Sequence, residues 1–152
     1  MKIFKAMMVV VALGSLLTYS GCKKKDGPGQ TPQDAQLVKL SKTWKFSKVT
    51  LDGVDQTGYS NFQLTISGTA GQTTFGYTCS GRPALSPWPA SGTFTYGDGA
   101  LFSTSLKRDD ALPITYSVDD KATQLQLTFN YSGNGFSRVD NVKGNWVFTL
   151  VP

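Results

Sequence analysis

Residues 124–131 read Gln-Leu-Gln-Leu-Thr-Phe-Asn-Tyr, and this stretch decides the fold class. Polar and apolar residues alternate strictly along it, which is the period of a β-strand with one buried face. The same alternation occurs in residues 61–67 and 114–118. We therefore predict that all three segments are strands of a β domain.

Five further segments have a fainter strand pattern, namely residues 43–51, 73–79, 93–96, 101–106 and 145–151. Turn residues such as Asp52-Gly53 and Gly97-Asp98-Gly99 separate the segments. Eight short strands with tight turns predict an all-β, eight-stranded antiparallel up-and-down β-barrel, with a β-sandwich as the alternative. Trp44 and Val49 have opposite phase within the first strand, so we expect a bulge near Ser47.

Residues 34–40 fit a short N-terminal helix before the first strand. Leu37 and Leu40 lie on one apolar stripe, and Asp34 stands where an N-cap residue is expected. A helix of about two turns is stable only when it packs against other elements. We therefore expect it to cover one end of a domain that spans residues 34–152.

The N-terminus has the pattern of a secretory signal peptide over residues 1–21. Lys2 and Lys5 precede an uncharged apolar run at residues 6–17. This run is shorter than the roughly 20 apolar residues of a membrane-spanning helix, and a buried core helix or a signal anchor is the alternative. Residues 22–33 lack large apolar side chains, which predicts a flexible tether.

Residues Ser20-Gly21-Cys22 resemble the lipobox of bacterial lipoproteins. The resemblance implies that Cys22 carries a diacylglycerol thioether and an amine-linked chain such as palmitate, which together hold a protein stably on a membrane. Lys23 follows, where enterobacterial lipoproteins retained in the inner membrane carry aspartate, so we expect the outer membrane, on its periplasmic or cell-surface side. Cys79 then has no intramolecular partner and is either a small buried residue or a reactive thiol.

The net charge of +5 comes mostly from the N-terminus. Of the 15 basic residues, five precede residue 27, whereas ten basic and nine acidic residues follow. The basicity therefore belongs with export and the membrane surface, and we expect no nucleic-acid binding.

Two absences limit the chemistry of this chain: it contains no histidine, and all its acidic residues are aspartates. Histidine is the commonest metal ligand and the usual acid–base group near neutral pH, so most catalytic triads and zinc sites are excluded. We expect a non-enzymatic protein with no catalytic residue, metal or cofactor. A hydrolase that uses aspartates is the remaining enzyme alternative.

Four stretches resemble the lipocalin-like domains of Bacteroidetes lipoproteins. They are Thr43-Trp44-Lys45-Phe46, residues 88–94, Arg108-Asp109-Asp110 and residues 144–150. The match covers residues 37–152, although Lys42 stands where lipocalins proper have glycine before the first-strand tryptophan. The resemblance implies a calycin-like barrel in a family whose members mostly lack an assigned function, and ligand carriage does not follow from it.

Two tryptophans are candidate core residues. Trp44 and Trp146 lie in the first and last strands, which are neighbours in a closed barrel, and we expect them to form a pair under the N-terminal helix. Arg138 could stack on one of these rings. A ligand-stacking role for the tryptophans is the alternative.

Trp88 lies in the proline-rich segment of residues 82–89, which has no strand pattern. A tryptophan held between prolines is a stiff platform for a sugar face or a partner's apolar side chain. The alternative is a loop that covers the barrel mouth and buries Trp88. Tyr59 and Asn61 are weaker candidates for the rim of the same ligand site.

Residues 107–110, Lys-Arg-Asp-Asp, are expected to form a solvated loop with local ion pairs, while calcium binding or acid–base chemistry is the alternative. The polar face of the strands is rich in Thr, Ser, Gln and Asn, and charged residues make up only 16% of the chain. A neutral surface of hydroxyls and amides suits a glycan. We expect a monomer that binds a small apolar or glycan ligand, with docking onto a membrane complex as the alternative function.

Overall fold

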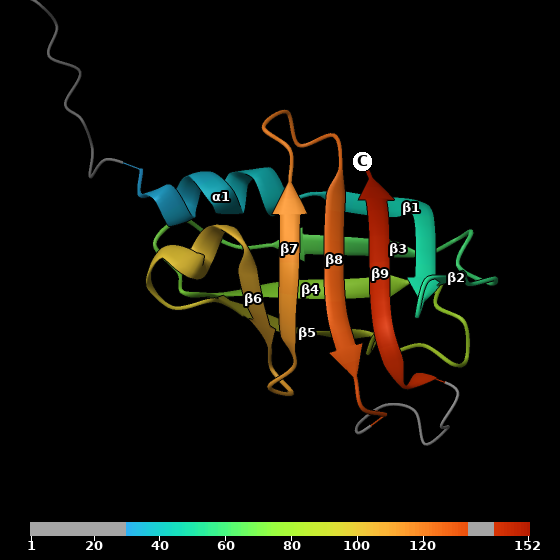
Figure 1. The fold of residues 1–152 in the computed structure, drawn as a ribbon. Coiled ribbons are helices and arrows are strands. Elements are labelled where there is room, and N and C mark those ends of the chain that lie inside the picture. The colour runs from blue at the N-terminus through green and yellow to red at the C-terminus, as the bar shows by residue number, and fades with distance from the viewer. Residues whose placement is uncertain (1–29, 134–141) are drawn as a thin grey trace, which may run out of the picture.

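The structure is a computed structural model that describes residues 30–133 and 142–152 (Figure 1). The expectations for the signal peptide, for lipidated Cys22 and for Arg138 concern residues outside these ranges. The elements in order are α1 (Pro32–Leu40), β1 (Thr43–Leu51), β2 (Val54–Asp55), β3 (Gln63–Ser67), β4 (Thr74–Ser80), β5 (Ser91–Tyr96), the 3₁₀ helix η1 (Gly99–Ser103), β6 (Ser105–Arg108), β7 (Pro113–Val118), β8 (Leu125–Tyr131) and β9 (Gly144–Val151).

The strands form a closed antiparallel β-barrel. Each strand pairs with its neighbour in the order β1-β3-β4-β5-β6-β7-β8-β9, and β9 pairs back with β1 to close the ring. The two-residue strand β2 pairs only with β1, outside the ring. The predicted eight-stranded up-and-down barrel is confirmed, and the sandwich alternative is wrong. In Figure 1, β7, β8 and β9 cross in front of β3, β4 and β5 at a steep angle.

Two local features of the hairpins agree with the sequence. Asp52 and Gly53 both have positive φ, 50° and 81°, which is the backbone of a tight hairpin turn between β1 and β2. The β1–β9 register shifts between Phe46 and Lys48, which is the bulge expected near Ser47.

One predicted strand is placed differently. Residues 99–103 form η1, and the strand runs over residues 105–108 instead of 101–106. Leu106 and Arg108 point inward on this strand, whereas the side chain of Leu101 is 56% exposed. The two leucines are five residues apart, so they could never share one face of a strand.

The helix α1 begins earlier than expected, and Asp34 is not its N-cap. Thr31 is the N-cap, and its hydroxyl accepts from the amide of Asp34 at 3.1 Å. The carboxylate of Asp34 accepts in return from the amide and the hydroxyl of Thr31, which completes a capping box. As expected, α1 covers one end of the barrel, where Leu37 and Leu40 join the core.

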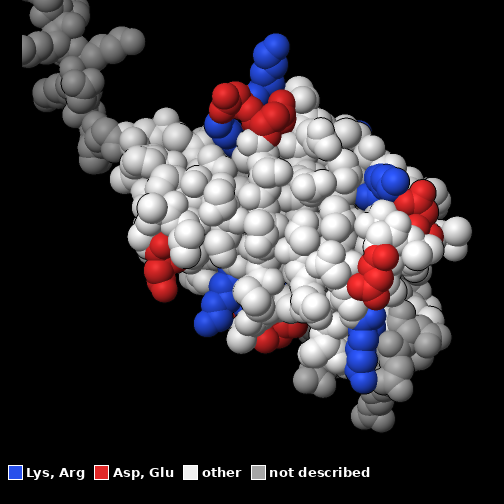
Figure 2. All heavy atoms as spheres, viewed as in Figure 1, with Lys and Arg blue, Asp and Glu red and all other residues white. Residues whose placement is uncertain are grey.

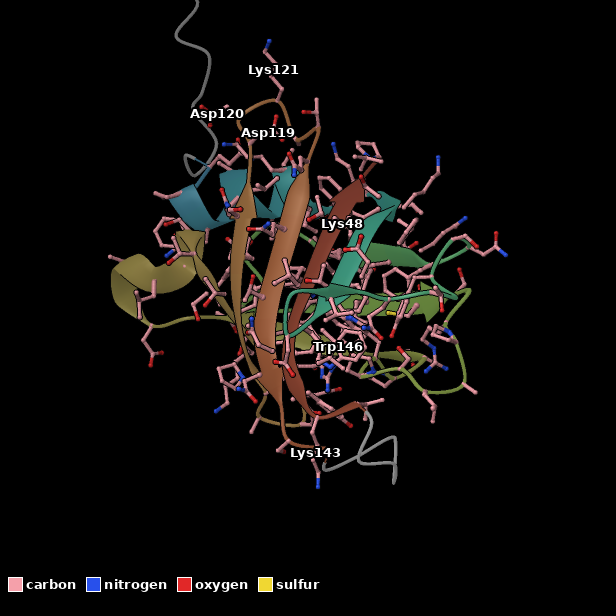
Figure 3. The ribbon with its side chains drawn as sticks, turned by 45° about the vertical axis from the view of Figure 1, so that its right-hand side comes forward. Lys48, Asp119, Asp120, Lys121, Lys143 and Trp146 are labelled. Carbon is pink, nitrogen blue, oxygen red and sulfur yellow. The ribbon has the colours of Figure 1, made fainter. Side chains whose placement is uncertain are left out.

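Trp44 and Trp146 do not form a pair. Both side chains are buried, and their strands β1 and β9 are hydrogen-bonded neighbours as expected. Trp146, however, is paired in register with Leu51, seven residues along β1 from Trp44. Trp44 donates from Nε1 to the carbonyl of Leu40 at the α1 end, while Trp146 lies at the opposite end (Figure 3). Antiparallel register separates the two rings even though their strands touch.

Candidate functional site

The structure places Trp88 inside the barrel, as in the alternative that buries it. Its side chain is 0% exposed and meets four other rings edge to face. The centroid distances are 5.6 Å to Tyr77, 6.1 Å to Phe94, 5.5 Å to Phe129 and 5.8 Å to Phe148. The β4–β5 connection therefore inserts into the barrel from the end opposite α1, and no face of the Trp88 ring meets solvent.

Two arginines hold this connection in place. Arg108 donates from Nη1 to the carbonyl of Pro87 at 2.8 Å, and its guanidinium lies 5.3 Å from the centroid of the Trp88 ring. Arg82 donates to the carbonyl of Trp88 at 2.5 Å. Arg108 thus makes a cation–π contact with a tryptophan of the barrel, the role that the sequence suggested for Arg138.

The segment of residues 107–110 contains a local ion pair, as expected, but Arg108 is not solvated. The side chain of Arg108 is fully buried and makes a two-pronged ion pair with Asp110, at 2.9 Å from Nε and 2.6 Å from Nη2. These hydrogen bonds hold the pKa of Asp110 below its usual value. Asp109 accepts from the amide of Thr93 at 3.0 Å. Both aspartates therefore have structural partners.

The predicted rim residues Tyr59 and Asn61 lie in different environments. Tyr59 is 2% exposed and packs against Trp146 and Phe148, whereas Asn61 is exposed. Cys79 is buried on the inner side of β4, and desolvation raises its pKa to about 12. Its thiol stays protonated at neutral pH, which agrees with a small buried residue rather than a reactive one.

The interior of the described barrel is occupied by side chains from both ends. The leucines of α1 fill one mouth, and Trp88 with Arg108 fills the other. The two hollows described below lie outside this packed interior. The larger of these two hollows has a volume of about 550 Å³, and we call it the helix groove.

The helix groove lies between the start of α1, the β3–β4 turn and the segment from β5 into η1. It is lined by Thr31, Gln33, Asp34, Gly71, Gln72, Thr73, Thr95, Tyr96, Gly97, Asp98, Gly99 and Phe102. Hydroxyl, amide and carboxylate groups thus surround two aromatic rings. No single sequence segment shows this site, because three separate segments supply it.

The aromatic part of the helix groove is held rigidly. The ring of Tyr96 packs on Phe75 at a centroid distance of 5.0 Å, and Phe102 stands perpendicular to Tyr96 at 6.4 Å. The hydroxyl of Tyr96 donates to the carbonyl of Gln33 at 3.3 Å, which ties β5 to α1. Both rings are partly exposed, and both line the groove.

The acidic part of the groove is fixed by backbone donors. The amide of Gly71 donates to Asp34 at 2.6 Å, and together with the Thr31 hydrogen bonds it lowers the pKa of Asp34. Asp34 is therefore ionised at neutral pH, and Asp98 stands exposed at the rim. Carboxylates accept hydrogen bonds from the hydroxyls of a polyol, and amides can both accept from these hydroxyls and donate to them. An aromatic ring can cover the apolar face of the same polyol.

Comparisons with protein-family models, with curated proteins and with solved structures found no match for this chain. The resemblance to lipocalin-like lipoproteins therefore remains an expectation from the sequence. None of the helices in residues 30–133 and 142–152 is both long and apolar enough to cross a membrane. Within the same residues, no cluster of three or more His, Cys, Asp or Glu could hold a metal ion.

Replacing Trp88 should leave a large cavity inside the barrel. We expect Trp88→Ala to lower the free energy of unfolding by about 3–5 kcal/mol, measured by urea denaturation followed by circular dichroism. Leu85→Ala, on the exposed part of the same connection, is the control and should change stability by less than about 0.5 kcal/mol. Equal effects of the two substitutions would contradict the packing described for Trp88.

The Arg108–Asp110 pair should make stability depend on pH. The folded pKa of Asp110 is lowered from 3.8, so its contribution is complete above that value and is lost as pH falls through the lower folded pKa. We expect Asp110→Asn to be less stable than the parent chain at pH 7, with a difference that narrows below about pH 3.8. Asp120→Asn, which removes an exposed ion pair with Lys39, should have little effect at either pH. A difference for Asp110→Asn that is constant across pH would contradict the ion pair.

Proposed function

We propose that this protein is a non-enzymatic outer-membrane lipoprotein that is anchored through Cys22 and binds a glycan in the helix groove. The observation that carries the glycan part is the groove itself, where Tyr96 and Phe102 stand among hydroxyl, amide and carboxylate groups. A volume of about 550 Å³ is within the usual size of small-molecule sites. A site for a sugar needs both aromatic and polar groups, because a sugar ring has an apolar face and a rim of hydroxyls.

The surface beside the groove supports a neutral ligand. The outward positions of β7, β8 and β9 hold Thr, Ser, Gln, Asn, Val and Pro and no charged residue. Figure 2 shows this face as a broad uncharged area with the charged residues near its margins. A neutral glycan would meet neither strong attraction nor repulsion there, which favours recognition by hydrogen bonds over recognition by charge.

The position of the groove also suits a protein held by its N-terminus. Thr31 lines the groove and follows Cys22 by nine residues, a span of roughly 30 Å when fully extended. A lipid at Cys22 would keep the groove within that distance of the bilayer surface. The ligand would then be a glycan of the cell envelope.

Docking onto a membrane complex is the second candidate function, and one observation favours it. The 3₁₀ helix η1 has no buried residue, and its Leu101 is 56% exposed. An apolar side chain on a protruding turn can insert into a partner protein. This surface borders the helix groove. Leu101 does not line the groove, whereas Phe102 does, so substitutions at these two residues can separate docking from glycan binding.

Phe102→Ala should remove the aromatic wall of the helix groove and weaken glycan binding at least tenfold. The measurement is a glycan array followed by titration calorimetry, with the mature chain and its best ligand. Phe46→Ala is the matched control, because Phe46 is also a half-buried phenylalanine packed on the core and lies outside the groove. If no glycan binds above background, docking becomes the leading function; if both variants bind equally, the groove is not the site.

Cys22→Ser should abolish lipidation. Cells fed radiolabelled palmitate should incorporate it into the parent chain and not into Cys22→Ser, and only the parent chain should fractionate with the outer membrane. Cys79→Ser is the control and should keep the label, because the thiol of Cys79 is buried. Label that persists in Cys22→Ser would contradict the proposed anchor.

A further inference from the structure

A second hollow lies at the end of the barrel opposite α1, and we call it the end crevice. It has a volume of about 340 Å³ and is formed by three segments: the β2–β3 connection, the β4–β5 connection and the residues that lead into β9. Its floor is Tyr59, Val142 and Trp146, and its wall includes Pro83 and Leu85. None of these residues lines the helix groove.

The floor of the end crevice is apolar except for one group. Tyr59, Val142 and Trp146 are 2%, 1% and 1% exposed, and the Tyr59 and Trp146 rings pack edge to face at 6.0 Å. The indole Nε1 of Trp146 donates to the carbonyl of Val142 at 2.8 Å. The polar atom of Trp146 is therefore satisfied, and the phenol of Tyr59 is the remaining polar side-chain group of the floor.

The phenol of Tyr59 has no hydrogen-bond partner within the described protein. Ser86 is close enough to lower the pKa of Tyr59 against the larger effect of burial, but its hydroxyl does not meet hydrogen-bond geometry with the phenol and accepts from the amide of Trp88 at 3.2 Å. A buried donor without an acceptor costs about 1–3 kcal/mol of stability. Because burial raises the pKa of Tyr59 to about 12, the group remains a neutral donor at physiological pH.

The wall beside this donor can move. Leu85 is 43% exposed, so it loses few core contacts when it changes rotamer. Gly58 has a φ of +84°, and a Cβ at that position would lie 3.4 Å from the Cβ of Pro83. This distance is an ordinary van der Waals contact, so the β2–β3 and β4–β5 connections lie close together on two sides of the end crevice.

We propose that the end crevice is a second ligand site, which binds a small apolar molecule carrying one hydrogen-bond acceptor. The apolar body lies on Trp146 and Val142 between Pro83 and Leu85, and the acceptor takes the hydrogen bond from Tyr59 Oη. In the free protein the phenol oxygen of Tyr59 has no contact with solvent. A ligand therefore reaches this oxygen only after Leu85 has rotated outward. The site differs in place and in ligand chemistry from the helix groove, and it does not depend on the proposed glycan function.

Two probes of similar shape test the proposal with the mature chain. Acetophenone and ethylbenzene differ by one carbonyl oxygen, and titration of each against ¹⁵N-labelled protein gives its Kd. We expect saturable shifts of the Val142 amide and the Trp146 indole N–H. In the parent chain, acetophenone should bind more tightly than ethylbenzene because its carbonyl accepts from Tyr59. In Tyr59→Phe this hydrogen bond is lost, so the ratio of the ethylbenzene Kd to the acetophenone Kd should fall about tenfold. Using the ratio removes the difference in hydrophobicity between the probes.

Two further variants make the result decisive. Leu85→Trp should fill the crevice and abolish binding of both probes, without disturbing the core because Leu85 is at the surface. Phe102→Ala in the helix groove should leave both Kd values unchanged. A ratio that is the same in Tyr59→Phe, shifts that map to residues away from the end crevice, or the absence of saturable binding would each overturn the proposal.

Discussion

The buried guanidinium of Arg108 is the constraint on which the rest of the barrel interior depends. A charged group among aromatic rings is unfavourable unless its donors are satisfied and its charge is paired. Asp110 supplies the paired carboxylate from the β6–β7 turn, and Pro87 supplies a carbonyl from the β4–β5 connection. One side chain therefore ties together two loops at the same end of the barrel and fixes the ring of Trp88 between them.

The packed interior limits where a ligand could bind. With α1 over one mouth and Trp88 in the other, carriage of a ligand inside the barrel would require the ejection of a fully buried tryptophan. The helix groove and the end crevice instead lie where loops from distant parts of the chain meet around the closed barrel. A rigid barrel that presents ligand sites on its connections is a common arrangement. The chemistry of the two hollows differs because hydroxyl, amide and carboxylate groups line the first, whereas the buried floor of the second is Tyr59, Val142 and Trp146.

Local signals predicted the barrel well and the site poorly. The alternation in residues 124–131 is a property of neighbouring residues, and it alone places one face of β8 in the core. The Thr31-x-x-Asp34 spacing of the capping box was also visible in the sequence, but Asp34 is itself a good N-cap residue and was chosen instead. For the helix groove, the local signals were only Tyr96 and the Gly97-Asp98-Gly99 turn, because its other walls come from α1 and the β3–β4 turn.

The sequence by itself determined the eight strands of the closed ring, the inward faces of the strongly alternating strands β3, β7 and β8, the bulge in β1 and the shortage of catalytic groups, because each follows from residue type and short-range spacing. Only the tertiary structure decided the burial of Arg108 and Trp88, the separation of Trp44 from Trp146 and the position of both hollows. These depend on strand register and on loops that meet from opposite parts of the chain. Spacing along a sequence carries no information about which distant acceptor a buried donor will find.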